Sequence, residues 1–139
     1  MSKLLRQPPD EILYLGDWLL IRAMRRANGD LPAREWFEGM DERMRGRFRA
    51  AAEIVERSLQ IGRPTAGRTS VVRESSQRLQ ELRITPKGST PPHLRLFFLR
   101  RDRVLWATHG FTKQSNSLPR HEIELADRIA VEWLKRREE

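Results

Sequence analysis

Three basic side chains in the second half of the sequence are spaced so that they can act together on a phosphate group. Arg83 and Arg95 alternate with apolar residues in two segments of extended character, and Lys113 directly follows a third segment of this kind. If these segments pair as neighbouring strands, side chains in the same phase share one surface of the sheet. Alternating arginine is also common on a solvated sheet face, so the pattern alone is compatible with a purely structural role.

Cations gathered at a phosphate suit the cleavage of RNA by its own 2′-hydroxyl group, a reaction that needs no external nucleophile. It needs one group to accept the hydroxyl proton, one to stabilise the charged phosphorane and one to protonate the leaving 5′-oxygen. Arginine and lysine stabilise charge, and a lysine or histidine with a shifted pKa transfers protons. Basic residues alone therefore provide a chemically reasonable active site.

Other sources of chemistry are missing from the sequence. It has no cysteine, which excludes disulfides, thiolate zinc sites and thiol nucleophiles. Its histidines have neither a second histidine nor a carboxylate at the spacing of helical metal ligands, and it has no glycine-rich phosphate loop and no serine in a nucleophile elbow. We therefore expect neither a metal nor a cofactor.

The charge balance points to a polyanionic partner. The 139 residues include 27 Lys and Arg against 19 Asp and Glu, which gives a formal net charge of +8 and a pI near 11.1. Clustered cations attract phosphate backbones, and the release of counterions adds affinity at low salt. This balance favours nucleic acid as the partner, with a solvated basic surface or an acidic protein partner as the alternatives.

The length indicates one domain over residues 1–139, with residues 1–16 as a less ordered N-terminal extension. Apolar runs such as residues 18–21 are too short to cross a bilayer, and the start of the chain lacks the apolar stretch of a signal peptide. We therefore expect a cytoplasmic protein with no membrane partner.

The first half of the chain predicts a strand followed by helices. Residues 18–24 suit a strand, and the turn residues 27–32 end in a proline that suits a first helical turn. The next stretch has one apolar helical stripe, with Gly39 as a plausible break between two helices. The stripe consists of Phe37, Met40, Met44, Phe48, Ala51, Val55 and Leu59.

The second half predicts paired strands and a final helix. Residues 79–84 and 94–99 alternate between two faces, and the short turn at residues 101–103 leads into a strand over residues 104–109. A helix follows Pro119 and has an apolar stripe suited to docking on the sheet. That stripe contains Ile123, Ala126, Ile129, Ala130 and Trp133.

Four segments in this order resemble the RelE/HigB superfamily of toxins from bacterial toxin–antitoxin modules. They are the E-L-R stretch at residues 81–83, the arginine that opens the apolar strand at residues 93–98, the H-G-F-x-K element at residues 109–113, and the P-x-x-E-I-x-x-A element at residues 119–126. The pattern is most similar to the phage-derived branch of that superfamily. The resemblance extends over roughly residues 17–136.

The resemblance implies a small α+β domain of the RelE/ParE type, in which an antiparallel sheet carries an N-terminal helical pair and a C-terminal helix. It also implies cleavage of mRNA without a metal, usually on the ribosome. By position, Arg83, Arg95 and Lys113 match the family's basic site residues, and Arg95 matches the arginine that stabilises the scissile phosphate. His109 matches the histidine of H-G-F-x-K, although a position on a strand near Trp106 suits a structural role equally well.

Further residues and partners complete this expectation. His93 and Lys87 flank the sheet and are candidates for proton transfer, with Lys87 also a candidate RNA contact. Arg43, Arg47 and Arg49 lie off the apolar stripe and are expected to bind RNA or an acidic segment of an antitoxin. The expected partners are mRNA, the ribosome and a cognate antitoxin with a helix-turn-helix fold.

Two other functions remain open at this point. Relatives of the ParE type bind DNA gyrase without an RNA site, and a phage-derived protein can persist as a binding protein only. The chain departs from the family pattern in two places. Residues 114–116 are Gln-Ser-Asn where many members have a second lysine. Some relatives use a tyrosine near the C-terminus, whereas the one tyrosine of this chain is Tyr14. If the nuclease assignment holds, we expect Arg95→Ala to leave folding intact and to relieve growth arrest.

Overall fold

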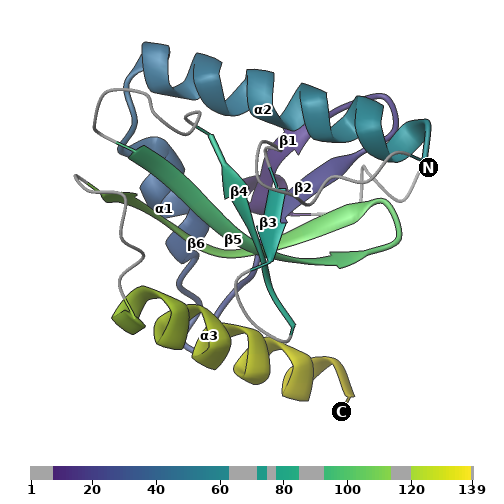
Figure 1. Cartoon of the computed structure of the whole chain (residues 1–139). Helices are drawn as coiled ribbons and strands as arrows, with labels where there is room; N and C mark the ends of the chain where they lie inside the picture. Colours follow the sequence, from purple (N-terminus) through teal and green to yellow (C-terminus); the bar gives the residue numbers. More distant parts are fainter. Residues whose placement is uncertain (1–7, 63–71, 75–77, 85–92, 114–119, 139) are drawn as a thin grey trace.

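The computed structural model describes residues 8–62, 72–74, 78–84, 93–113 and 120–138. Within these residues a single sheet lies between two layers of helices, with α1 and α2 on one side and α3 on the other (Figure 1). This arrangement confirms the predicted α+β fold with an N-terminal helical pair and a C-terminal helix.

The sheet has six strands in the order β1-β2-β6-β5-β4-β3. Its strands are β1 (Ile12–Leu15), β2 (Leu20–Ala23), β3 (Val72–Glu74), β4 (Gln80–Arg83), β5 (His93–Arg101) and β6 (Val104–Lys113). Neighbours are antiparallel except for β2 and β6, which pair in parallel. The predicted hairpin joins β5 to β6, with Asp102 at φ 56° in its turn.

Local residue types mark several of the helix boundaries. After a short 3-10 turn at Pro9–Glu11, the helices are α1 (Pro32–Glu38), α2 (Glu42–Gln60) and α3 (Arg120–Glu138). Pro32 opens α1, and the Asp41 side chain caps α2 by accepting a hydrogen bond from the Met44 amide at 2.8 Å. The break between α1 and α2 follows Gly39, as predicted, and Gly62 with φ +74° ends α2.

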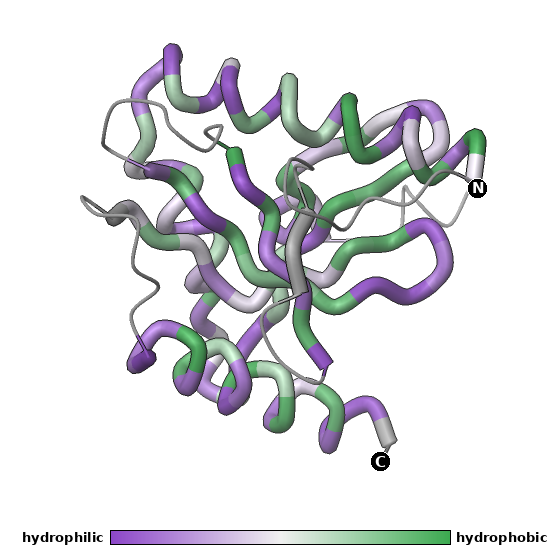
Figure 2. Tube along the Cα trace, viewed as in Figure 1, coloured by the Kyte–Doolittle hydropathy of each residue, from purple (hydrophilic) through white to green (hydrophobic). Residues whose placement is uncertain are grey.

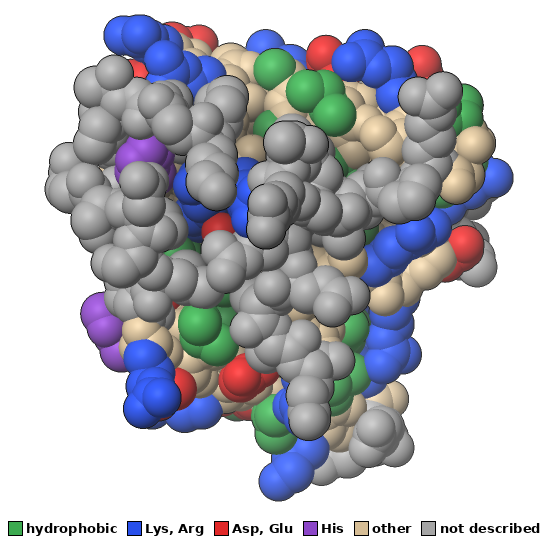
Figure 3. Space-filling model, in the orientation of Figure 1, with side chains coloured by type: hydrophobic (Ala, Val, Ile, Leu, Met, Phe, Trp, Pro, Cys, Tyr) green, Lys and Arg blue, Asp and Glu red, His purple; other side chains and the backbone are tan. Residues whose placement is uncertain are grey.

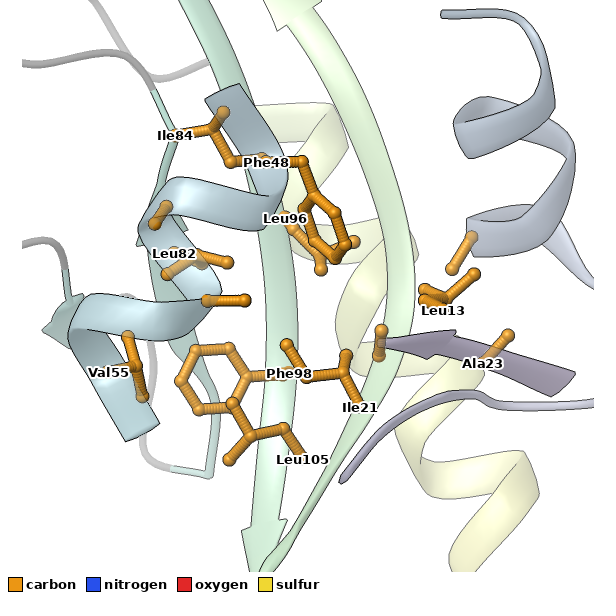
Figure 4. Close-up of a cluster of buried hydrophobic side chains, with 14 of the residues drawn as sticks. Leu13, Ile21, Ala23, Phe48, Val55, Leu82, Ile84, Leu96, Phe98 and Leu105 are labelled. Atoms are coloured by element: carbon orange, nitrogen blue, oxygen red, sulfur yellow. The ribbon is translucent and has the colours of Figure 1, made fainter. Parts of the chain in front are cut away.

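Two apolar cores form because the strands alternate. Leu82, Leu96 and Phe98 face α1 and α2, whereas Phe97 and Trp106 face α3. Figure 4 shows side chains of α2 directed toward the strands. Figure 2 shows hydrophobic residues concentrated along the central strands and hydrophilic residues at the β5–β6 turn. The alternation that the sequence predicts for residues 79–84 and 94–99 is therefore confirmed.

The N-terminal residues differ from the expectation. Part of the predicted extension is β1, which pairs with β2 and is tied to α2 by Glu56. This carboxylate accepts hydrogen bonds from the Tyr14 hydroxyl at 2.6 Å and from the amides of Trp18 and Leu19 at 2.7 and 2.6 Å. Residues 12–15 form a strand because β2 pairs with their backbone and the half-buried Glu56 carboxylate accepts the Tyr14 hydroxyl. The predicted strand at residues 18–24 is shorter and corresponds to β2.

Candidate functional site

Strand pairing brings the predicted site residues to one face of the sheet, the face that also carries α3. Arg83 on β4 lies directly opposite Arg95 on β5, so their side chains project to the same side. His93 precedes Arg95 by two residues and therefore shares this face. The backbone of Lys113 on β6 pairs with that of His93. The side chain of Lys113 and the whole of Lys87 lie outside the described residues.

Arg95 is buried and paired with a carboxylate that the site prediction missed. Its side chain is 6% exposed and its Nε lies 3.0 Å from Oε1 of Glu81, whose side chain is 1% exposed. Arg95 also donates a hydrogen bond from Nη1 to the Leu94 carbonyl at 2.9 Å. Glu81 stands two residues before Arg83 in the E-L-R stretch, so strand alternation alone places it on this face.

The burial of this pair corrects one expectation. Truncating Arg95 would leave the Glu81 carboxylate buried without its countercharge, which costs stability. In place of the expectation that Arg95→Ala leaves folding intact, the buried ion pair predicts that this substitution destabilises the fold. Arg83 is only partly buried, so it is the more accessible of the two arginines. In Figure 3 basic, acidic and histidine side chains gather on this face near the end of β4 and the start of β5.

His109 lies under the first turns of α3. Its Nε2 is 3.1 Å from Oε2 of Glu122, and its ring centroid is 5.5 Å from that of Phe97 and 6.2 Å from that of Phe111. Burial lowers the pKa of the imidazole from its usual 6.5, against the opposing effect of Glu122. These contacts support the structural alternative for His109, in which it fastens α3 to the sheet.

A bulge in β6 gives the H-G-F-x-K element its shape. Pairing between β5 and β6 shifts between Leu96, which faces Gly110, and Phe98, which faces Ala107, so β6 holds an extra residue. A side chain at Gly110 would collide with the indole ring of Trp36 on α1. Glycine is therefore required here because α1 packs directly against the strand.

The predicted RNA-binding arginines of α2 are solvent-exposed. Arg43, Arg47 and Arg49 all lie on the outer surface of the helix. Arg45 has a different role, because it donates hydrogen bonds to the carbonyl oxygens of Phe37 and Glu38 at 3.4 and 2.9 Å and so ties α2 to α1. RNA binding by the exposed arginines stays a prediction.

The described part of the chain contains neither a metal-ligand cluster nor a membrane-spanning helix. Within residues 8–62, 72–74, 78–84, 93–113 and 120–138, no three His, Cys, Asp or Glu side chains come together as metal ligands would. In the same residues, no helix combines the length and apolar character needed to cross a bilayer.

Comparison with known families identifies the larger part of the chain. Residues 35–130 match the model of the family described as phage derived protein Gp49-like (DUF891), which is associated with RelE-like toxins. The match begins within α1 and ends within α3, and it includes Glu81, Arg83 and Arg95. No curated protein matches the chain at a significant level. Because the matched stretch spans more than half of the sequence, the chain belongs to the Gp49-like family of phage-derived proteins.

Proposed function

We propose that this protein is the toxin of a type II toxin–antitoxin module and that it cleaves mRNA by attack of the 2′-hydroxyl on the adjacent phosphate. The observation that carries the proposal is the placement of Arg83 opposite Arg95, with Glu81 in an ion pair with the buried arginine. Membership of a family associated with RelE-like toxins supports it.

Two directly opposed arginines are an unfavourable arrangement unless anions balance them, because like charges across a strand pair repel. Glu81 balances Arg95 at 3.0 Å. A phosphate group placed at Arg83 would bring a further anion to this pair of arginines. In the proposed reaction Arg83 contacts the scissile phosphate, and the buried Arg95 beside it contributes a second positive charge. Because negative charge builds up on the phosphorane, these two charges stabilise the phosphorane more strongly than the ground state.

Two titratable groups flank Arg95 on the same face and suit the proton transfers. Oε2 of Glu81 is buried and accepts no hydrogen bond within the described residues, so it has a free lone pair for the proton of the 2′-hydroxyl. His93 on β5 is the candidate donor to the leaving 5′-oxygen. The P–O5′ bond breaks as the 2′-oxygen bonds to phosphorus, which gives a 2′,3′-cyclic phosphate and a 5′-hydroxyl.

In this role the protein acts on mRNA at the ribosome, without a metal, and a helix-turn-helix antitoxin restrains it. The exposed arginines Arg43, Arg47 and Arg49 of α2 would provide the docking charge for ribosomal RNA, a contribution that weakens with salt. A short adjacent reading frame that encodes a helix-turn-helix protein would support this pairing.

Expression in a bacterial host tests the proposal. The wild type should arrest growth and Arg83→Gln should not, whereas the matched variant Arg100→Gln, which removes an exposed charge from the far end of β5, should remain toxic. Primer extension after induction should show discrete transcript cuts. An Arg83→Gln variant as toxic as the wild type would contradict the proposed site, and growth arrest with a DNA-damage response but intact transcripts would indicate a gyrase inhibitor instead.

A further inference from the structure

A second group of charged residues lies at the opposite end of β5 and β6, where the last turns of α3 meet the N-terminal residues. A cleft of about 200 Å³ opens here, lined by Glu11, Arg25, Trp133, Arg136 and Arg137. None of these five residues falls within the stretch that matches the Gp49-like family, residues 35–130. The cleft is therefore a feature of the parts of this chain that flank the family match.

Indole rings and guanidinium groups pack together beside the cleft, and Trp133 and Arg137 of this group line it. The rings of Trp106 and Trp133 are 4.7 Å apart, and the Arg137 guanidinium lies 4.5 Å from the centre of each. Arg22 covers Trp106 at 4.4 Å, and Arg101 lies 5.9 Å from Trp133. These contacts hold the guanidinium groups in fixed orientations over aromatic faces.

The carboxylates of this region are already bonded to two of its arginines. Glu11 binds both Arg22 and Arg25, with an oxygen 3.1 Å from Nε of Arg25. Asp10 accepts hydrogen bonds from Arg25 with both oxygens at 2.9 Å. Asp10 and Glu11 therefore already have arginine partners in Arg22 and Arg25.

Three arginines of the cluster, namely Arg101, Arg136 and Arg137, have no carboxylate partner within the described part of the chain. Arg136 donates one hydrogen bond from Nη1 to the Arg25 carbonyl at 2.7 Å, which fixes the side chain and leaves its other donors available. Burial and the nearby charges of Arg22, Arg101 and Arg136 lower the pKa of Arg137, and Glu11 only partly opposes them. The cluster thus carries uncompensated positive charge.

We propose that this cleft binds a phosphate group of single-stranded RNA, with Arg136 and Arg137 as the hydrogen-bond donors. Guanidinium forks match the paired oxygens of a phosphate, and fixed orientation reduces the entropy lost on binding. A positively charged groove that follows the backbone is typical of proteins that bind single strands. The buried Trp106 and Trp133 rings serve here to orient the guanidinium groups. The proposal is independent of the nuclease assignment, because it needs no residue of the cleavage site.

The full chain should bind a fluorescein-labelled 2′-O-methyl oligonucleotide, a probe that cannot be cleaved through a 2′-hydroxyl, with saturable fluorescence anisotropy. Arg136→Gln and Arg137→Gln should each raise Kd at least tenfold, whereas Arg128→Gln, which removes an exposed charge from the same helix, should change Kd less than twofold. Because the three variants lose the same net charge, general attraction to the polyanion is matched. Arg137→Lys, which keeps the charge but lacks the fork, should bind with intermediate affinity.

Circular dichroism melts of the Arg136→Gln and Arg137→Gln variants should show that both remain folded at the assay temperature. Equal losses of affinity in all three glutamine variants, or no loss at all, would overturn the proposed site. Competition experiments identify the ligand. If adenosine monophosphate binds as tightly as the oligonucleotide, the assignment to a nucleic-acid strand is overturned. If poly-glutamate displaces the oligonucleotide at the same concentration of negative charge, the preference for phosphate is overturned.

Discussion

Removing Arg95 should destabilise the fold strongly, and removing its partner together with it should not. The Arg95 and Glu81 side chains are 6% and 1% exposed, and Nε and Oε1 are 3.0 Å apart. Arg95→Ala leaves the Glu81 carboxylate in a site that water reaches poorly. Breaking a buried ion pair in this way typically costs about 3–5 kcal/mol of the free energy of unfolding.

The double variant Arg95→Met with Glu81→Leu replaces both charges by apolar side chains that fit the Phe97 and Phe111 environment of this face. Such replacements are typically neutral or stabilising by about 1–4 kcal/mol. We therefore expect the double variant to be at least as stable as the wild type, although it should be inactive as a toxin. Arg100→Ala is the control, because Arg100 is exposed on the same strand and should change stability by about 0.5 kcal/mol or less.

Urea unfolding followed by circular dichroism measures these differences, provided that the slope of the transition is unchanged. An Arg95→Ala variant that loses less than about 1 kcal/mol would refute the reasoning. A double variant whose loss equals the sum of two large single losses would also refute it, because the two side chains would then contribute independently.

Three further predictions concern glycine packing, the histidine under α3 and the carboxylate that holds β1. Gly110→Ala should lower the free energy of unfolding by about 1–3 kcal/mol because the new methyl group meets Trp36, whereas Gly46→Ala, with open space around it, should raise stability by about 0.5–1 kcal/mol in urea unfolding. Because burial holds the pKa of His109 below its usual 6.5, the unfolded state takes up the proton first as the pH falls. The stability of the fold should therefore decrease as the pH drops below about 6.5. In thermal melts between pH 7 and pH 5, His109→Gln should reduce this dependence of stability on pH. Burial raises the pKa of Glu56, but hydrogen bonds from Tyr14, Leu19 and Trp18 outweigh this effect and lower the pKa below 4.5. The contribution of the Glu56 carboxylate to stability should therefore be lost as the pH falls below 4.5. Glu56→Gln should weaken the pH dependence of stability in this acidic range.

Local sequence patterns predict the strands and helices that carry the candidate site. Alternation places Arg83 and Arg95 on one face because strand side chains have a period of two residues. Gly39 marks the break between α1 and α2 because its weak helix propensity is a local property. These features depend on residues close together in the chain, so one sequence is enough to find them.

Features that depend on distant partners are not predictable in this way. Residues 12–15 have no clean period, and they form a strand because β2 and Glu56 of α2 satisfy their polar groups. The parallel pairing of β2 with β6 leaves no local signal in either segment. The burial of Arg95 depends on Glu81 from a neighbouring strand, and the cleft at Arg137 depends on Glu11 near the other end of the chain.

The chemical nature of the transcript ends tests the central claim most directly. After brief induction of the wild type, mapped cuts should carry a 2′,3′-cyclic phosphate upstream and a 5′-hydroxyl downstream, and both should disappear with Arg83→Gln but persist with Arg100→Gln. Intact transcripts during growth arrest, or cuts that carry 5′-phosphate ends, would contradict cleavage by the 2′-hydroxyl at this site.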